Sequence, residues 1–579
     1  MTKTFLISGV VFLAMGGPAA MSQTTPSIFE SPAPPTPVSE LDKIVFAKLS
    51  SLNIQPALCS DPVFVRRVYL DVIGTLPTAK EVREFIDDSD TQNKRRLLID
   101  RLLERDEFAD YWAMKWGDVL RIKAEFPVNL WPNAAQAYHR WVRSSIAGNK
   151  PYDKFVRELL TSSGSNFRVG PVNFYRAVQN RTPEGIAGAV ALTFMGSRAE
   201  SWPKDRLSGM TVFFSQIGYK PTREWKEEHV FWDFLGTSAV AANAASEKTT
   251  GSDSKGASLA EAAPPASRTP QTAVFPDGTA IQLPPDRDPR ELFADWLITP
   301  KNPWFTRSIV NRVWAWLLGR GIIHEPDDIR EDNPPSNPEL LAYLESELVG
   351  SHYNLKHLYR LVLNSNTYQF SSMPRFSDPQ AEAIFATYSL RRLDAEVLID
   401  AINKITGESD LYTSAVPEPF TYIPRDKPAI ALADGSVTSP FLTLFGRSAR
   451  ATGMENERNN KPVSSQCLHM LNSSHIRLKL EQGPKLKAIF ESGRKPEEIV
   501  EELYLTILSR RPTADEVTIA LEYGKPGTTG AESKAAAGKG GKAGGGKAGV
   551  KKAAAMKNRA DWVDITWALI NSTEFLYRH

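Results

Sequence analysis

The chain has 579 residues, enough for two or three domains, and its composition is that of an ordinary globular protein. With only Cys59 and Cys467 it is not a disulfide-stapled scaffold, and the sequence leaves open whether these two residues form a bridge. The formal net charge is +2, but residues 525–557 contain eight lysines and one glutamate. The rest of the chain is therefore mildly acidic, which argues against a nucleic-acid-binding body and predicts no nucleic-acid partner.

The N-terminus has the pattern of a secretory signal peptide. Lys3 supplies a positive charge, residues 5–15 (FLISGVVFLAM) are apolar, and small residues follow up to Ser22. The apolar run is too short to span a bilayer, and no later stretch is long and apolar enough to do so. We therefore expect residues 1–22 to be removed on export to the periplasm or beyond, with no transmembrane segment. The Pro-rich leader at residues 23–37 is expected to be extended and disordered.

Residues 38–236 predict an N-terminal helical domain. Phe64, Val68 and Val72 recur at helical spacing, and Thr78 with Glu81 forms a capping box at the start of the next helix. Further helices are predicted at about 93–104, 107–123, 133–147, 151–162, 183–195 and 203–217.

Residues 237–272 are rich in Ala, Ser, Gly and Lys and predict a disordered linker. Residues 273–579 predict a second helical domain that opens with a small β-hairpin around Pro276-Asp277-Gly278. Gly319 is placed to end the helix of residues 303–318, and residues 524–557 are a low-complexity Lys/Gly/Ala insertion expected to be disordered. Other helices of this domain are predicted at about 288–299, 337–349, 354–366, 393–406 and 462–480. The fold class is therefore mainly α, with two helical domains.

The sequence contains no nucleotide-binding glycine loop, no H-E-x-x-H and no G-x-S-x-G, and it predicts no cofactor. The close histidine pairs are His352 with His357 and His469 with His475. Neither pair has Cys or carboxylate neighbours at metal-ligand spacing, so we interpret them as solvated or core residues and predict no metal site. The tryptophans fall mostly at helical core spacing, which favours packing over exposed sugar-stacking platforms.

Three polar clusters stand out. Arg66, Arg67 and Asp71 lie on one predicted helix, where an intrahelical ion pair and a tertiary salt bridge are expected. The second cluster is a Pro-rich loop that contains Asp327, Asp328, Glu331 and Asp332. It predicts a solvated turn with helix-capping residues at Asn337 and Pro338, and its alternative interpretation is a Ca²⁺ site made of these four carboxylates.

The third cluster, at residues 445–462, mixes charges in an irregular segment. It contains the candidate binding residues Arg447, Arg450 and Arg458, together with Glu455 and Glu457. Such a segment suits a binding loop and equally suits a charged crossover between helices.

Several segments carry a family resemblance. FVRRVYLDVIGTLPTAKEVREFIDD, RRLLIDRLLERDEFADYWAMKWGDVLRI and KPYDKFVRELL resemble the planctomycete cytochrome-type domain of unknown function. DPRELFADWLITPKNPWFTRSIVNRVWAWLLGRGIIHEPDDIREDNPPSNPELLAYL, FGRSARATGMENERNNKPVSSQCLHMLNSSHI, ELYLTILSRRPTADEV and DITWALINSTEFLYRH resemble its companion C-terminal domain of unknown function.

The resemblance implies export from Planctomycetes- or Verrucomicrobia-like bacteria and genomic company with sulfatase-like proteins, but no known activity. Many members carry a haem-attaching C-x-x-C-H. The matching stretch here, residues 194–203, has neither the cysteines nor the histidine, so no haem is expected.

Three functional hypotheses follow. The first is an exported envelope protein with a binding or assembly role. Its partner would be envelope polysaccharide or another exported protein of the same gene neighbourhood. The second is a hydrolase acting on polysaccharide, with Asp327, Asp328, Glu455 or Glu457 as catalytic carboxylates. The third is a haem-less relative of a redox protein. Convergence of Asp327 and Asp328 with residues 447–458 in one pocket would favour the hydrolase, whereas separate exposed loops would favour binding.

Overall fold

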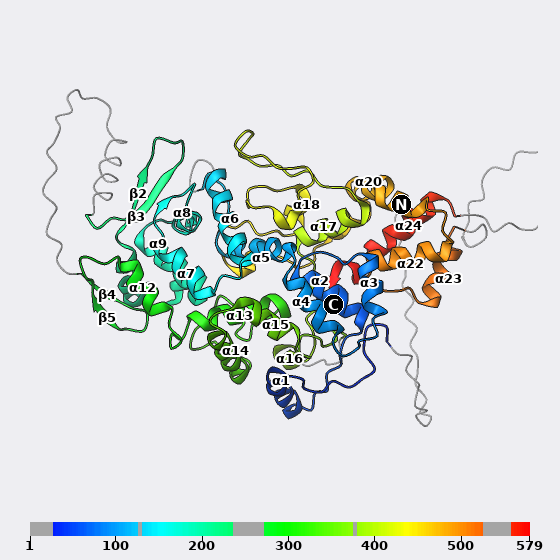
Figure 1. Cartoon of the computed structure of the whole chain (residues 1–579), viewed down its shortest axis with the longest axis horizontal. Helices are drawn as coiled ribbons and strands as arrows, with labels where there is room; N and C mark the ends of the chain where they lie inside the picture. The colour runs from blue at the N-terminus through cyan, green and yellow to red at the C-terminus, as the bar shows by residue number, and fades with distance from the viewer. Residues whose placement is uncertain (1–26, 126–129, 236–270, 374–378, 525–556) are drawn as a thin grey trace, which may run out of the picture.

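The computed structural model describes residues 27–125, 130–235, 271–373, 379–524 and 557–579 (Figure 1). Within these ranges the chain is mainly helical, with one three-stranded sheet and two two-stranded sheets, which confirms the predicted fold class. None of the helices in these ranges is both long enough and apolar enough to cross a membrane. The predicted signal peptide, most of the linker and nearly all of the basic insertion lie outside the described residues.

The helices before the linker are α1 (Glu40–Ser51), α2 (Asp61–Val72), α3 (Ala79–Ile86), α4 (Lys94–Leu103), α5 (Asp106–Val119), α6 (Pro132–Ala147), α7 (Tyr152–Thr161), α8 (Asn173–Ala177), α9 (Pro183–Val190) and α10 (Lys204–Thr211). The predicted capping box is present, because the Thr78 side chain accepts the amide of Glu81 and the Glu81 side chain accepts the amide of Thr78. A sheet that the sequence did not predict joins a short strand between α7 and α8 to two strands that follow α10. It consists of β1 (Gly164–Ser165), β3 (Glu228–Trp232) and β2 (Ile217–Pro221), in that order and antiparallel.

After the linker, the predicted hairpin is present as β4 (Thr272–Val274) and β5 (Ala280–Gln282), and its first strand begins at the last residue of the predicted linker. The helices that follow are α12 (Pro289–Leu297), α13 (Phe305–Leu318), α14 (Pro338–Gly350), α15 (Leu355–Leu363), α16 (Pro379–Ala383), α17 (Ala395–Thr406), α18 (Pro440–Leu444), α19 (Ser464–Asn472), α20 (Ser474–Gln482), α21 (Pro484–Phe490), α22 (Pro496–Ile507), α23 (Ala514–Glu522), α24 (Arg559–Ile570) and α25 (Thr573–Leu576).

Two helix ends in this part have clear local causes. Gly319 ends α13 with φ +88°, the left-handed conformation that favours glycine, as predicted. The single helix predicted at 462–480 is instead two helices, because Ser473 adopts an extended conformation and its hydroxyl caps α20 by accepting the amide of Ile476.

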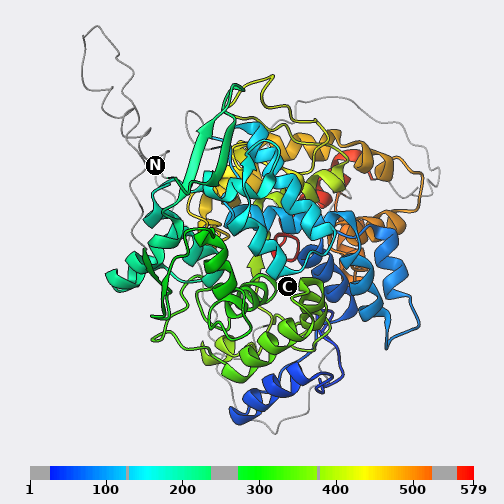
Figure 2. The same ribbon diagram turned by 60° about the vertical axis from the view of Figure 1, so that its left-hand side comes forward.

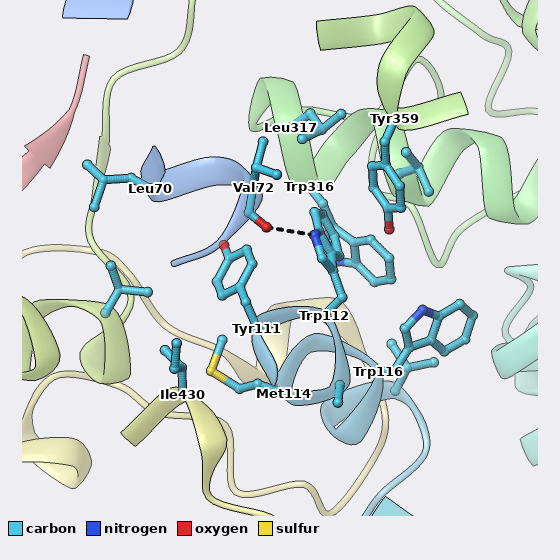
Figure 3. Close-up of a cluster of buried hydrophobic side chains, with 14 of the residues drawn as sticks. Leu70, Val72, Tyr111, Trp112, Met114, Trp116, Trp316, Leu317, Tyr359 and Ile430 are labelled. Atoms are coloured by element: carbon cyan, nitrogen blue, oxygen red, sulfur yellow. Dashed lines mark hydrogen bonds between the residues drawn. The ribbon is translucent and has the colours of Figure 1, made fainter. Parts of the chain in front are cut away.

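Buried residues from both predicted domains form one hydrophobic cluster. Figure 3 shows Trp112 of α5 packed beside Trp316 of α13 and Tyr359 of α15, with ring centroids 5.5 Å and 4.3 Å away. The Trp112 indole N–H donates to the carbonyl of Val72 at 3.1 Å. The prediction that tryptophans serve packing therefore holds for these residues, and the two predicted domains share a core.

The beginning and the end of the chain also pack together. Helix α3 contacts α22, and both views of the ribbon place the blue N-terminal helices beside the orange C-terminal ones (Figures 1 and 2). The short strands β6 (Arg391–Arg392) and β7 (Tyr577–Arg578) pair antiparallel, which brings the C-terminus to the start of α17.

The arginines of α2 do not form the expected intrahelical ion pair. Arg66 donates to the carbonyls of Ile507 and Phe575 at 2.8 and 2.7 Å. Arg67 donates to the carbonyls of Tyr368, Phe370 and His579. The physical reason is that α2 is buried from Val63 to Val72, so each guanidinium is surrounded by backbone carbonyls rather than by water.

Asp71 forms the expected tertiary salt bridge with a distant partner. It pairs with Arg578 at 3.2 Å and accepts hydrogen bonds from the hydroxyls of Tyr368 and Tyr388 at 2.9 and 2.7 Å.

The described part of the leader differs from its prediction, because it packs on the body. Ser31 N–H donates to the carbonyl of Leu58 at 2.9 Å, and the Asn366 amide donates to the carbonyl of Thr36 at 2.5 Å. Cys59 is buried, Cys467 is exposed, and the two are not bonded to each other.

We predict that Arg578→Leu strongly destabilises the fold. Arg578 pairs with the buried carboxylates of Asp71 and Asp394, and its loss leaves both with one fewer cation. Removing one partner of a buried ion pair costs about 3–5 kcal/mol, to be measured by urea unfolding. As a control, Arg477→Leu removes an exposed helical ion pair with Glu481 and should cost less than about 1 kcal/mol. Equal losses in the two variants would contradict this prediction.

Candidate functional site

A polar pocket of about 870 Å³ lies between α5, α13, the start of α17 and the C-terminal strand β7. We call it the polar pocket. It is lined by Lys115, Ala315, Trp316, Gly319, Arg320, Gly321, His324, Glu325, Pro326, Leu390, Arg391, Arg392, Asp394, Glu455, Asn456, Arg458, Asn459, Asn460, Lys461, Pro462, Tyr577 and Arg578. Its walls thus come from segments spread from residue 115 to residue 578.

The acidic turn and the mixed-charge loop of the sequence analysis meet at this pocket. The buried carboxylate of Asp327 accepts the backbone N–H of Glu455 at 2.6 Å and pairs with Arg312 of α13 at 2.6 Å. Glu325, Pro326 and Glu455 then line the pocket side by side in space. The convergence is partial, because neither Asp327 nor Asp328 lines the pocket, and Asp328 pairs with Arg330 at 3.1 Å.

Glu455 is the carboxyl group best placed to act on a ligand. Its Oε2 accepts the indole N–H of Trp316 at 2.9 Å, and the side chain lines the pocket. Burial raises the pKa of Glu455, and the negative charge of Asp327 acts in the same direction. The group is therefore suited to donate a proton.

Asp394 lies in the same wall, but its pKa is shifted in the direction opposite to that of Glu455. It accepts hydrogen bonds from Lys115 at 3.0 Å, Arg578 at 2.8 Å and the Asn460 amide at 2.7 Å. Burial opposes its ionisation, but the charges of Lys115, Arg578 and Arg458 hold the pKa of Asp394 well below its usual range. Asp394 is an anion whose acceptor positions are taken by the protein itself.

Of the three candidate binding arginines, only Arg458 lines the pocket. It joins Asp118 of α5 at 2.7 Å to Glu396 of α17 at 2.6 Å. Arg450 pairs with Asp118 at 3.0 Å, and Arg447 pairs with Glu396 at 3.1 Å.

Arg447 and Arg450 are therefore buried connectors, which corrects their assignment as ligand-binding residues. Both guanidiniums are used up by protein acceptors because the loop packs between α5 and α17. Arg450, for example, also donates to the carbonyls of Ile122 and Ala433 at 3.1 Å.

Glu457 shapes the loop from within. Its carboxylate accepts the backbone N–H groups of Ala451 at 2.7 Å and Thr452 at 3.1 Å, and it does not line the pocket. Glu457 is thus a loop-forming residue, and its candidacy as a catalytic carboxylate has no support in the geometry.

The four carboxylates of the calcium alternative are separated. Asp327 faces Arg312, Arg330 pairs with both Asp328 and Asp332, and Glu331 is exposed. Within the described ranges, no group of three or more His, Cys, Asp or Glu side chains has the geometry of a metal site. The capping interpretation is confirmed, since the Asn337 side chain accepts the amide of Leu340 and Pro338 begins α14.

The stretch around Gly196 and Arg198 borders the pocket. The carbonyl of Gly196 accepts the N–H of Ile329 at 2.8 Å, and Arg198 pairs with the pocket residue Glu325 at 2.7 Å. The Ser197 hydroxyl accepts the indole N–H of Trp202. Protein contacts thus hold this stretch against the turn of residues 324–329.

Sequence reasoning missed most of the pocket. Lys115, Arg320 and Arg391 showed no local pattern, and neither did the other lining residues outside the two loops. The one usable signal was the mixed-charge loop, which supplied Glu455 and Arg458.

The fold is that of a mainly helical protein, and two parts of the chain match known family models. Residues 40–196 match PSCyt2, a protein of unknown function (DUF1549), and residues 289–524 match PSD1, a protein of unknown function (DUF1553). The chain belongs to the proteins that carry this pair of domains. No curated protein and no solved structure matches it.

We predict that the stabilising role of Glu396 depends on pH. Although burial opposes it, the charge of Arg458 lowers the pKa of Glu396 from 4.5 to about 2, and Arg447 adds to the effect. The ionised form therefore stabilises the fold fully above pH 4.5, and this contribution is lost as the pH falls toward 2. The free energy of unfolding, measured with urea, should be about 3–5 kcal/mol higher for wild type than for Glu396→Gln at pH 7. This difference should shrink below pH 4.5.

The control for this prediction is Glu491→Gln, at an exposed position where no such difference is expected. A pH-independent gap between wild type and Glu396→Gln would show that packing rather than charge is responsible.

Proposed function

We propose that the chain is an exported envelope protein that binds polysaccharide, and that the polar pocket holds an anionic unit of that polymer. The observation that carries the proposal is the charge of the wall. Among the described residues, seven cationic side chains line the pocket, against the three carboxylates Glu325, Asp394 and Glu455. A wall of this kind attracts sulfate and carboxylate groups, and its volume suits one or a few sugar rings.

Two cations at the pocket are free to engage a ligand. Arg320 and Lys461 have no side-chain hydrogen bond or ion pair with any described residue, and Lys461 is exposed. Their charge is not neutralised by the protein, unlike that of Arg458. They are the residues whose removal tests the proposal with the least harm to the fold.

A second candidate is hydrolysis of the bound polysaccharide, favoured by Glu455. Its raised pKa suits a general acid, and the anionic Asp394 lies in the same wall, as in sites where two carboxyl groups have divergent pKa values. Binding is the better supported function, because the Asp394 carboxylate already accepts three hydrogen bonds from the protein, which a catalytic water or a sugar would have to compete with.

We predict tight binding of a sulfated galactan oligosaccharide and weak binding of its desulfated counterpart, measured by calorimetry at low salt. Arg320→Ala with Lys461→Ala should lower the affinity at least about tenfold, since two unpaired charges are lost. The matched control is Arg223→Ala with Lys301→Ala, which removes the same charge from exposed positions outside the pocket and should leave the affinity unchanged.

The basic insertion could also bind a polyanion, because residues 525–557 contain eight lysines and one glutamate. A variant that lacks these residues therefore distinguishes binding by the pocket from binding by the insertion. Retained binding in this variant supports the pocket. If the deletion abolishes binding while the Arg320/Lys461 variant binds like wild type, the insertion is the binding element and the pocket proposal is wrong.

We further expect that the wild-type chain releases no new reducing ends from this oligosaccharide. The measurement is a reducing-sugar assay at pH 5 to 7 with Glu455→Gln beside wild type. Release that Glu455→Gln abolishes while keeping the binding affinity would establish the hydrolase instead.

A further inference from the structure

We propose that His469 of α19 and His475 of α20 form a two-histidine site for a transition-metal ion of the zinc, nickel and cobalt type. The site shares no lining residue with the polar pocket and stands independently of the proposed function. It lies in a separate hollow of about 530 Å³, whose lining includes both histidines, Glu408, Asp410, Ser439 and Lys479.

The distance between the two imidazoles carries the proposal. His475 Nδ1 and His469 Nε2 face each other at 3.5 Å. This is long for an N–H···N hydrogen bond, which falls at about 2.7–3.2 Å. It is close to the separation of two nitrogens on one tetrahedral ion, which is about 3.4 Å when each metal–nitrogen bond is about 2.0–2.1 Å.

The other nitrogen of His475 has the support that metal-bound histidines have. His475 Nε2 contacts Asp410 Oδ1 at 3.0 Å. With the ring proton on Nε2 the carboxylate accepts a hydrogen bond there, which leaves the lone pair of Nδ1 on the side of His469. Asp410 is buried and is itself fixed by Lys479 at 2.8 Å. The arrangement is a carboxylate–histidine pair aimed at the space between the imidazoles.

Neighbouring rings restrain the orientation of His469. Its imidazole packs edge-on against Phe441 and Phe445, with ring centroids 5.7 and 6.0 Å away.

The site offers two protein ligands. No group of three or more metal-binding side chains is present in the described parts of the chain, so water or an added ligand in the hollow completes the coordination. Imidazole nitrogens select zinc, nickel, copper and cobalt over calcium and magnesium. The pair His352 and His357 differs, because among the described residues no ring contact joins these two imidazoles, whereas His469 and His475 contact each other at 3.5 Å.

The test is titration of the full chain, prepared without a polyhistidine tag, with Co²⁺ and Zn²⁺ at pH 7.5. We expect one ion per chain, with a cobalt visible spectrum typical of nitrogen and oxygen ligands. His469→Ala and His475→Ala should each lower the affinity at least a hundredfold. Asp410→Asn should lower it about 10–100-fold, the effect of losing an outer carboxylate.

His357→Ala is the matched control and should bind like wild type. Cys467→Ser removes the exposed thiol on α19, and unchanged affinity in this variant excludes a thiolate ligand. Far-ultraviolet circular dichroism of each variant checks that it folds, and His475→Gln serves if His475→Ala does not. Absence of binding up to 1 mM in wild type, or an affinity equal to that of wild type in either histidine variant, overturns the proposal.

Discussion

The structure depends on buried carboxylates whose cations come from distant parts of the chain. Asp118 of α5 and Glu396 of α17 share Arg458, and Asp394 takes Lys115 and Arg578. A buried charge without its partner costs several kcal/mol, so α5, α17, the 447–458 loop and the C-terminus must assemble together. Such pairs add little net stability over apolar residues, but they allow few alternative arrangements. This explains why the two predicted domains share one core.

The same constraint forms the polar pocket. Arg447 and Arg450 hold the loop by their own ion pairs, and Glu457 closes it on its backbone amides. The loop then presents residues 455–462 toward α13, where Glu455 meets Asp327. After these ion pairs form, the wall of the pocket still carries more cations than carboxylates. Some of the cations, such as Arg458, are held in ion pairs that stabilise the fold, whereas Lys461 forms no ion pair with a described residue.

Local signals predicted what is local. Thr78 with Glu81, Gly319 and the hairpin at Pro276–Gly278 follow from rules that act over a few residues, and these features are present. The pocket follows from no such rule, since Lys115 and Asp394 are 279 residues apart. From the sequence alone, Arg66 and Arg447 would be expected at the surface because they are charged. The structure shows that both are buried and bonded to distant parts of the chain. Of the nine candidate site residues, Glu455 and Arg458 line the polar pocket and the other seven do not.

Helix α17 contributes residues to the surroundings of both proposed sites, but the two sites share no side chain. Its first turn carries Asp394 and Glu396, which belong to the charge network of the polar pocket. Its last turns carry Asn403, whose side chain accepts Lys479 at 2.8 Å, and Lys479 in turn fixes Asp410 behind His475. Since the lining residues of the two hollows do not overlap, an ion at the histidine pair displaces no group of the polar pocket. Helix α17 thus contacts both sites, and the buried ion pairs at its start hold it in place.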